Sequence, residues 1–187
     1  MENYTRSTRE LLFNLIGIKA TRKLYKGDLR PLMIGEGNIE PHPKLAMAFE
    51  LARRMLEEKL RRGPPLISSR VTTDYLTAHF LDKDHESFVV IFLDNQHRVL
   101  QIEELFKGTI DGALVYPREV VKTALKFSAA ACIFAHNHPS GVPEPSKADE
   151  SLTRRLKNAL ALVDIRTLDH IVVGGEMTVS FAERGLL

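Results

Sequence analysis

One short segment gathers the side chains of this sequence that are best suited to bind a metal ion. His136 and His138 follow an apolar run, and Ser146 and Asp149 lie further on, where a helix is predicted to begin. Successive side chains of an extended backbone point to opposite faces, so two histidines separated by one residue point to the same side. Pro139 favours an extended conformation at His138, which preserves this pairing. The spacing predicts two imidazoles and a carboxylate at a strand-helix junction, which is typical of a zinc site with one open position.

A structural interpretation of the same residues competes with the metal site. The run Ser146-Lys147-Ala148-Asp149 resembles an N-terminal capping box with aspartate in place of the usual Glu or Gln. The two histidines can likewise be polar residues of a loop. All of them together favour the metal site. The two interpretations of Ser146 are compatible, because a hydroxyl can accept a hydrogen bond from a helix N–H and donate one to a substrate oxyanion.

The sequence around these residues predicts an α/β domain in which helices pack against a mixed sheet. A nearly continuous apolar run over 87–93 and alternating residues over 99–105 predict two strands of a hairpin. A buried strand over 130–135 leads directly into the histidines, and an amphipathic helix over 147–163 follows them. The other predicted elements are helices over 73–80 and 119–127 and strands over 169–173 and 177–181.

Residues 1–63 predict a small separate helical region. Apolar residues from Leu45 to Leu60 recur every three or four positions, which predicts a helix from about Pro43 to Arg62. Residues 8–25 also have a helical pattern, and glycines and prolines break the chain between the two segments. We therefore expect two or three helices here. The domain boundary is predicted at 63–65, where the charge sign, the hydrophobic period and the proline content all change.

Composition and charge limit the classes of protein. The chain of 187 residues is 44% hydrophobic and 27% charged, as expected of a soluble globular protein. The apolar run 129–135 is too short to span a bilayer, and the first residues contain no secretory segment, so a cytoplasmic location is expected. The single cysteine, Cys132, excludes an internal disulfide and a cysteine-based zinc site, and is predicted to be buried and inert. Residues 1–63 carry a net charge of +5 and the remainder −3, so only the front region suits an anionic partner.

Longer stretches around the histidines resemble a known family. His136-x-His138-Pro139, followed by Ser146 and Asp149, is similar to the JAMM motif of the MPN metallopeptidase-like fold. HNHPSG and PSKAD, with YPREV upstream and LDHIVVG and SFAERGLL downstream, resemble the RadC branch of that superfamily, also called UPF0758-type. The resemblance covers about 66–187 and implies a mixed-sheet MPN domain (cytidine-deaminase-like) there, preceded by the small helical region.

The resemblance implies a zinc-dependent hydrolase in which a glutamate upstream of the histidines activates the metal-bound water. The family pattern is matched at His85-Glu86-Ser87-Phe88, which makes Glu86 the expected general base. An exposed acid at a strand edge is the alternative interpretation of this residue. Weaker candidates for the same role are Glu103, Glu104 and Glu119.

The implied mechanism uses Zn²⁺ held by His136, His138 and Asp149, which lowers the pKa of its bound water toward about 7. Glu86 takes the proton and returns it to the leaving amine, and Ser146 donates a hydrogen bond to the tetrahedral oxyanion. The expected substrate is a peptide or protein, cleaved at a peptide or isopeptide bond.

Two other functions stay open at the level of the sequence. A DNA-binding or repair-associated module is suggested by the helix-hairpin-helix-like front domain that RadC-type proteins commonly carry. Here the corresponding stretch 35–40 contains two acids and the front region looks shortened, so we expect at most weak, salt-sensitive nucleic-acid binding through residues 1–63. A non-catalytic MPN scaffold is the third possibility, and the presence of every expected ligand argues against it. His170 either orients a ligand together with Asp169 or is a structural histidine.

Overall fold

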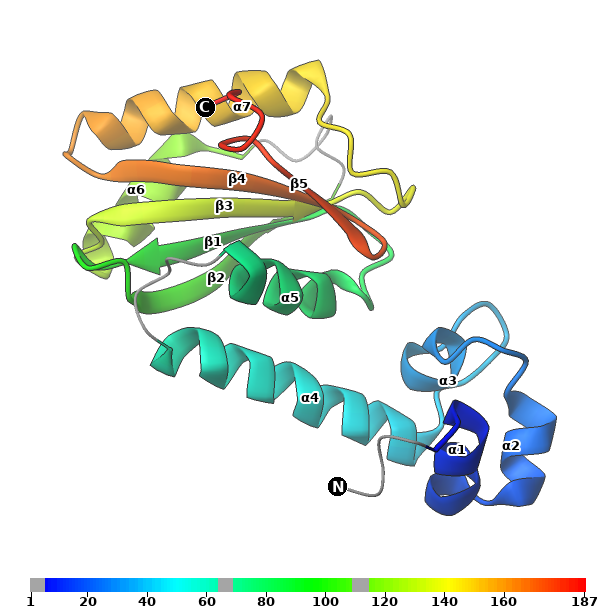
Figure 1. Cartoon of the computed structure of the whole chain (residues 1–187). Coiled ribbons are helices and arrows are strands. Elements are labelled where there is room, and N and C mark those ends of the chain that lie inside the picture. Colours follow the sequence, from blue (N-terminus) through cyan, green and yellow to red (C-terminus); the bar gives the residue numbers. More distant parts are fainter. Residues whose placement is uncertain (1–5, 64–68, 109–114) are drawn as a thin grey trace. The chain divides into compact units, whose positions relative to one another are not determined.

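The computed structural model describes residues 6–63, 69–108 and 115–187 (Figure 1). The chain divides into two compact units, Met1–Met55 and Leu56–Leu187. The predicted domain boundary includes Pro64 and Pro65, which lie outside the described residues, so that boundary stays a prediction. Among the described residues, no helix combines the length and the hydrophobicity that a membrane span requires.

The N-terminal unit is helical, as predicted, but its helices are more numerous than expected. Within the described residues it contains three short helices and the start of a long one: α1 (Thr8–Ile16), α2 (Ile18–Leu24), α3 (Arg30–Ile34) and α4 (Pro43–Arg62). The expected continuous helix over 8–25 is wrong, because Gly17 separates α1 from α2 with a φ of +88°, which favours glycine and ends a helix. Leu12, Leu32 and Leu45 form the buried core of this unit.

The second unit is built on a five-stranded mixed sheet, as the sequence predicted. The strands are β1 (Ser87–Leu93), β2 (Val99–Lys107), β3 (Ala131–Asn137), β4 (Arg166–Gly174) and β5 (Met177–Ser180), in the order β2-β1-β3-β4-β5. β1 and β2 form the predicted antiparallel hairpin, β3 runs antiparallel to β1, and β3 and β4 are parallel. β3 is therefore the central strand of the sheet.

Helices cover both faces of this sheet, which explains why β1 and β3 are buried along their whole length. Alternate residues of β1 and β3 pack on one face with α6 (Pro117–Lys126) and α7 (Lys147–Ala161), and the others pack on the opposite face with α5 (Ser69–Phe80) and Leu60 near the end of α4. Figure 1 shows α7 and α5 on opposite sides of the sheet. Cys132 is fully buried in the first of these layers, as predicted, and burial raises the pKa of its thiol to about 12.

The elements predicted for the second unit are all present, with differences at their ends. α5 begins at Ser69 rather than near residue 73, and β4 begins at Arg166 rather than at residue 169. The connection that matters for the candidate site is the one from β3 to α7, because it joins the central strand to the helix that packs across the sheet.

Candidate metal centre

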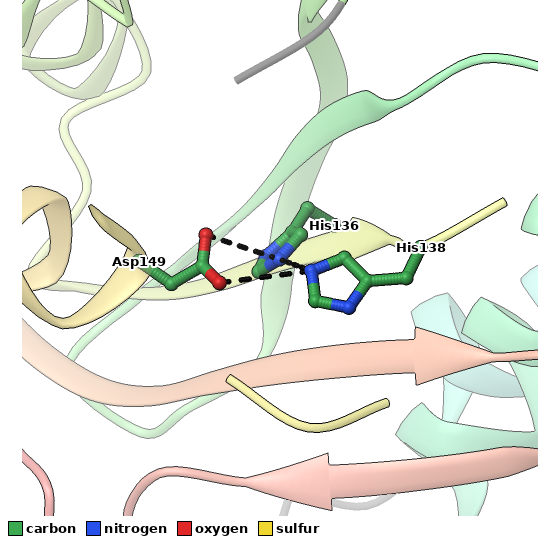
Figure 2. Close-up of side chains that lie close together, drawn as sticks. All are labelled: His136, His138 and Asp149. Atoms are coloured by element: carbon green, nitrogen blue, oxygen red, sulfur yellow. Dashed lines mark hydrogen bonds and ion pairs between the residues drawn. The ribbon is translucent and has the colours of Figure 1, made fainter. Parts of the chain in front are cut away.

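The end of β3 brings the two predicted histidines together. His136 lies between Phe88 of β1 and Val172 of β4 in the sheet register. Immediately after β3, the N–H of His138 donates to the carbonyl of Val173, at 2.8 Å, so the chain stays extended through both histidines. Their side chains point the same way, with the two Nε2 atoms 2.9 Å apart (Figure 2). The pairing expected from their spacing is confirmed.

Asp149 reaches the same point from the first turn of α7. The predicted capping box is present: the Asp149 N–H donates to Ser146 Oγ at 3.1 Å, and the Ser146 N–H donates to Asp149 Oδ2 at 2.7 Å. The other carboxylate oxygen, Oδ1, is buried and accepts no hydrogen bond. It lies 3.4 Å from His136 Nε2, while Oδ2 lies 3.6 Å from His138 Nε2. The cap thus fixes one oxygen of the carboxylate and leaves the other beside His136.

The separations of these atoms fit a small cation. Each of the three residues offers one ligand atom, and these atoms lie within 4.8 Å of one another. Bonds of about 2.0–2.1 Å in a tetrahedral zinc site place neighbouring ligand atoms about 3.3 Å apart. The 2.9 and 3.4 Å separations around His136 Nε2 lie on either side of that value. The group can therefore hold a metal ion.

The ring of His138 is oriented by the loop between β3 and α7. Its Nδ1 lies 2.8 Å from the carbonyl oxygen of Val142, which can only accept, so Nδ1 carries the proton of the neutral ring and Nε2 keeps its electron pair. The loop passes directly over Gly174 at the end of β4. A Cβ on Gly174 would lie 2.5 Å from the Pro143 nitrogen and 2.7 Å from the Val142 carbonyl carbon, so only glycine permits this approach.

The charges around the group favour a cation between the three residues. The Asp149 carboxylate raises the pKa of His138, against the opposing effect of burial, and Glu86 contributes in the same direction. Burial by itself raises the pKa of Asp149, but the two imidazoles outweigh it and hold that pKa well below its ordinary range. Asp149 therefore stays an anion although its side chain is only 1% exposed.

Glu86, the predicted general base, precedes β1 in a segment that is tied to β3. Asn137 lies between the two histidines in the sequence; its Oδ1 accepts from the Ser87 N–H at 2.8 Å, and its Nδ2 donates to the His85 carbonyl at 3.0 Å. These bonds hold the residues on either side of Glu86. The carboxylate is close enough to His138 to affect its pKa. The role of Glu86 as a base stays a prediction.

The hydroxyl of Ser146 uses its single proton inside the capping box. Ser146 Oγ donates to Asp149 Oδ2 at 2.7 Å, in addition to accepting from the Asp149 N–H. The predicted donation to a substrate oxyanion requires the hydroxyl to rotate away from Asp149.

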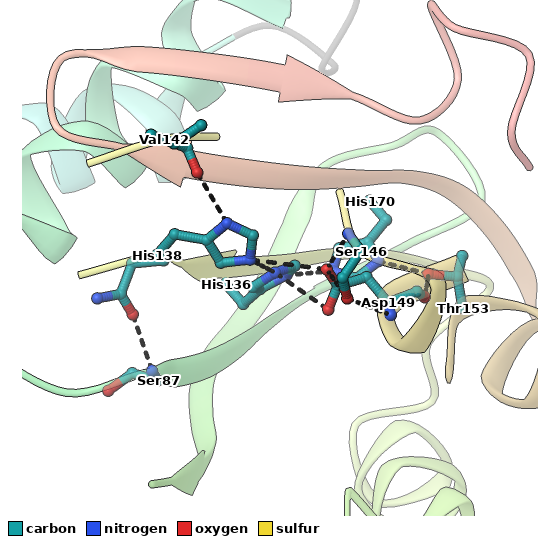
Figure 3. A network of polar contacts seen from close by, with 9 residues as sticks. Ser87, His136, His138, Val142, Ser146, Asp149, Thr153 and His170 are labelled. Atoms are coloured by element: carbon teal, nitrogen blue, oxygen red, sulfur yellow. Dashed lines mark hydrogen bonds and ion pairs between the residues drawn. The ribbon is translucent and has the colours of Figure 1, made fainter. Parts of the chain in front are cut away.

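Two residues lie directly behind the ligands (Figure 3). His170 of β4 is fully buried, with Nε2 2.8 Å from His136 Nδ1 and Nδ1 2.6 Å from Thr153 Oγ1. The sequence left the role of His170 open and did not single out Thr153. The available signal was that Thr153 lies one helical turn after Asp149, on the buried face of α7.

The fold and the site together define the class of protein. A mixed sheet covered by helices on both faces, with a His-His-Asp group where its central strand meets the next helix, is consistent with the JAB/MPN fold. The family profile described as "RadC-like JAB domain" matches residues 66–186, and the chain belongs to this family. The resemblance noted in the sequence is thereby confirmed.

Curated relatives of the chain carry the name UPF0758 protein. The protein from Nitrosococcus oceani is 54% identical over 180 residues, which cover 96% of this chain and 79% of the relative. The protein from Marinobacter nauticus is 60% identical over 146 residues, which cover 78% of this chain and 65% of the relative. The protein from Vibrio vulnificus is 51% identical over 174 residues, which cover 92% of this chain and 78% of the relative. These names state no activity.

Proposed function

We propose that the protein is a zinc-dependent hydrolase that cleaves amide bonds, either peptide or isopeptide, in a peptide or protein substrate. The observation that carries the proposal is the buried Asp149 carboxylate beside the two histidines: its Oδ1 accepts no hydrogen bond and lies 3.4 Å from His136 Nε2, and the Nε2 atoms of His136 and His138 are 2.9 Å apart. Two nitrogens and one carboxylate oxygen are a ligand set that zinc accepts, and three protein ligands leave a fourth position for water or substrate.

The chain's own residues have defined tasks in this proposal. His136, His138 and Asp149 would hold the ion. Bound zinc supplies a Lewis acid that polarises the substrate carbonyl and makes water acidic enough to react near neutral pH. Glu86 accepts a proton from the attacking water and donates it to the leaving amine, which needs its carboxylate within hydrogen-bond reach of both.

Ser146 has two tasks that follow one another. In the resting site its hydroxyl donates to Asp149 and helps to fix the carboxylate. When negative charge develops on the carbonyl oxygen of the substrate, the hydroxyl turns and donates to that oxygen instead, while the Ser146 N–H still holds Asp149 Oδ2. The hydrogen bond from the Ser146 N–H to Asp149 Oδ2 is thus kept during the reaction.

Metal content tests the first part of the proposal. Purified protein is expected to contain about one zinc per chain, and His136→Ala and Asp149→Ala are expected to abolish it, because each removes a ligand. Glu150→Ala is the matched control, since Glu150 is also an acid in the first turn of α7 but lies outside the ligand group. Wild-type protein that lacks metal after growth in zinc-supplemented medium would contradict the proposal.

A peptide-library digest tests the hydrolytic step. Glu86→Gln keeps the shape of the side chain but removes the base, so cleavage is expected to fall by roughly 10²–10⁴-fold. Glu58→Gln is the control, because Glu58 lies on α4 with a side chain that is 65% exposed, and α4 packs on the face of the sheet opposite to α7. Equal cleavage by wild type and Glu86→Gln would exclude Glu86 as the base. A zinc-loaded wild type that cleaves nothing would favour the non-catalytic scaffold.

A further inference from the structure

A chain of short polar contacts runs behind the candidate metal centre and joins two of its ligands (Figure 3). His136 Nδ1 lies 2.8 Å from His170 Nε2, and His170 Nδ1 lies 2.6 Å from Thr153 Oγ1. Thr153 Oγ1 in turn donates to the backbone carbonyl of Asp149, at 2.6 Å. This series of hydrogen bonds starts on β3, passes through β4 and ends on α7. It therefore connects the strand that carries one predicted ligand to the helix that carries another.

The direction of every hydrogen bond in this series follows from the last acceptor, the backbone carbonyl of Asp149. A carbonyl can only accept, so the single hydroxyl proton of Thr153 goes to the Asp149 carbonyl, and Thr153 Oγ1 is left as an acceptor toward His170. His170 must therefore carry its proton on Nδ1. Its Nε2 is then an acceptor and takes the proton of His136 Nδ1. The neutral ring of His136 is left with an unprotonated Nε2, the atom that faces Asp149 and His138.

The surroundings of His170 keep it neutral, as this order of protons requires. Its ring stacks on Phe181 with the centroids 4.8 Å apart and packs edge-on against Phe88 and Phe134. The side chain is fully buried, and burial disfavours the charged form of an imidazole. The ring is enclosed by aromatic side chains and has a polar partner on each nitrogen. The acceptor on Thr153 therefore decides which nitrogen of His170 carries the proton, and through His170 which nitrogen of His136 does, without the participation of solvent.

We propose that His170 and Thr153 are positioning residues that keep the Nε2 electron pair of His136 available to the cation. Thr153 selects the tautomer of His170, and His170 selects the tautomer and orientation of His136. The inference rests on the proposed zinc site, but it concerns a different property, the proton order behind one ligand. The cost of losing such a partner is typically 10–100-fold in metal affinity.

The first test compares zinc dissociation constants, measured by competition with a chromophoric chelator. His170→Phe keeps an aromatic ring against Phe181 but offers His136 no acceptor, so zinc binding is expected to weaken about 10–100-fold. Thr153→Val keeps the shape of the threonine but removes the acceptor for His170 Nδ1–H. His170 can then carry its proton on its Nε2 and donate it to His136 Nδ1, which forces the proton of His136 onto His136 Nε2. The zinc affinity is therefore expected to fall about 10-fold. Thr153→Ser restores the hydroxyl and should restore zinc binding.

A matched control separates this effect from a general loss of stability. Thr21 is also buried in a helix and donates through Oγ1 to the carbonyl four residues earlier, at 2.9 Å, but it belongs to the N-terminal unit. Thr21→Val should destabilise the fold to a similar degree and leave the zinc dissociation constant unchanged. Zinc binding by Thr153→Val and His170→Phe that equals wild type would overturn the proposal.

The second test reads the tautomers directly and does not depend on metal. Long-range ¹H–¹⁵N correlation spectra of the metal-free protein at a pH where His136 is neutral are expected to show the proton of His136 on Nδ1. The same spectra of Thr153→Val are expected to show it shifted to Nε2. A wild-type His136 with its proton on Nε2 would refute the proposal. If the wild type failed to bind zinc but showed the expected tautomer, the proposed function would fail while the inferred proton order would stand.

Discussion

Asp149 shows how one side chain can serve both the fold and the site. Its Oδ2 belongs to the helix cap, where it accepts from the N–H and the hydroxyl of Ser146, and its Oδ1 is kept for the ligand group. The structural interpretation of the Ser-x-x-Asp pattern is therefore confirmed for Oδ2, and Oδ1 stays available for the predicted ligand role. A carboxylate held at one oxygen has few orientations left, which reduces the entropy that metal binding must remove.

Removal of the Ser146 hydroxyl is expected to separate the two tasks of this residue. Ser146→Ala should cost about 1 kcal/mol of stability through the lost cap, and on the order of 10²-fold in hydrolytic rate at saturating zinc if the hydroxyl stabilises the oxyanion. Thermal unfolding and kinetics on a peptide that the wild type cleaves are the measurements.

Ser7→Ala is the matched control for that experiment. Ser7 is the N-cap of α1 and forms the same kind of capping box, with Glu10. It should lose a similar amount of stability without any change in hydrolysis. If Ser146→Ala hydrolyses the peptide at the wild-type rate, the hydroxyl does not stabilise the oxyanion and Ser146 acts only as the helix cap.

At the scale of elements, the site depends on three segments that meet at one end of the central strand. β3 supplies His136, the residue directly after its end supplies His138, α7 supplies Asp149, and the loop before α7 supplies the Val142 carbonyl that orients His138. β4 supports all three, because it pairs with β3, carries His170 and ends at Gly174 beneath the loop. A shift of β4 is therefore expected to displace all three predicted ligands.

Gly174→Ala tests this support. The added Cβ would lie 2.5 Å from the Pro143 nitrogen, so the loop has to move and the Val142 carbonyl moves with it. We expect a lower melting temperature and a weaker zinc affinity, by up to about 10-fold, because the ring of His138 loses its orienting partner.

Gly175→Ala provides the comparison, because a Cβ there meets nothing within 4 Å but the backbone has a φ of +62°. It should lose about 1 kcal/mol through backbone strain and keep its zinc affinity. Equal zinc affinities of Gly174→Ala and wild type would show that the loop orients His138 without support from β4.

At the scale of the whole molecule, the two units differ in charge and in chemistry. The candidate metal group lies in the second unit, whereas the positive charge is in excess in the first: Met1–Met55 carries 10 Lys/Arg and 6 Asp/Glu, net +4, and Leu56–Leu187 carries 16 and 18, net −2. The stretch predicted to resemble a DNA-binding hairpin does form a turn, with a bridge between Glu36 and Ile39 and positive φ at Gly35 and Gly37. Glu36 and Glu40 are exposed there, which gives the turn a negative charge that disfavours phosphate binding.

We therefore expect only weak binding of the full chain to duplex DNA, and a steep loss of it between about 50 and 200 mM salt, because a net positive region binds phosphates mainly through counterion release. Fluorescence anisotropy of a labelled duplex over this range is the measurement. Glu36→Gln combined with Glu40→Gln should strengthen binding at low salt. Tight binding by wild type that persists near physiological salt would contradict this expectation and favour the DNA-binding function.

The sequence by itself determined the features that depend on near neighbours. The alternation of β3 placed His136 and His138 on one side, the cap pattern placed Asp149 in the first turn of α7, and periodicity predicted the strands and most helices. Each of these follows from the geometry of a single strand or helix turn. The tertiary structure decided what depends on register between distant segments: His170 lies behind His136 because β4 pairs with β3 in one particular alignment. Thr153 meets His170 only because α7 packs across that sheet, and no local pattern encodes a contact between two elements that pack together by burying apolar surface.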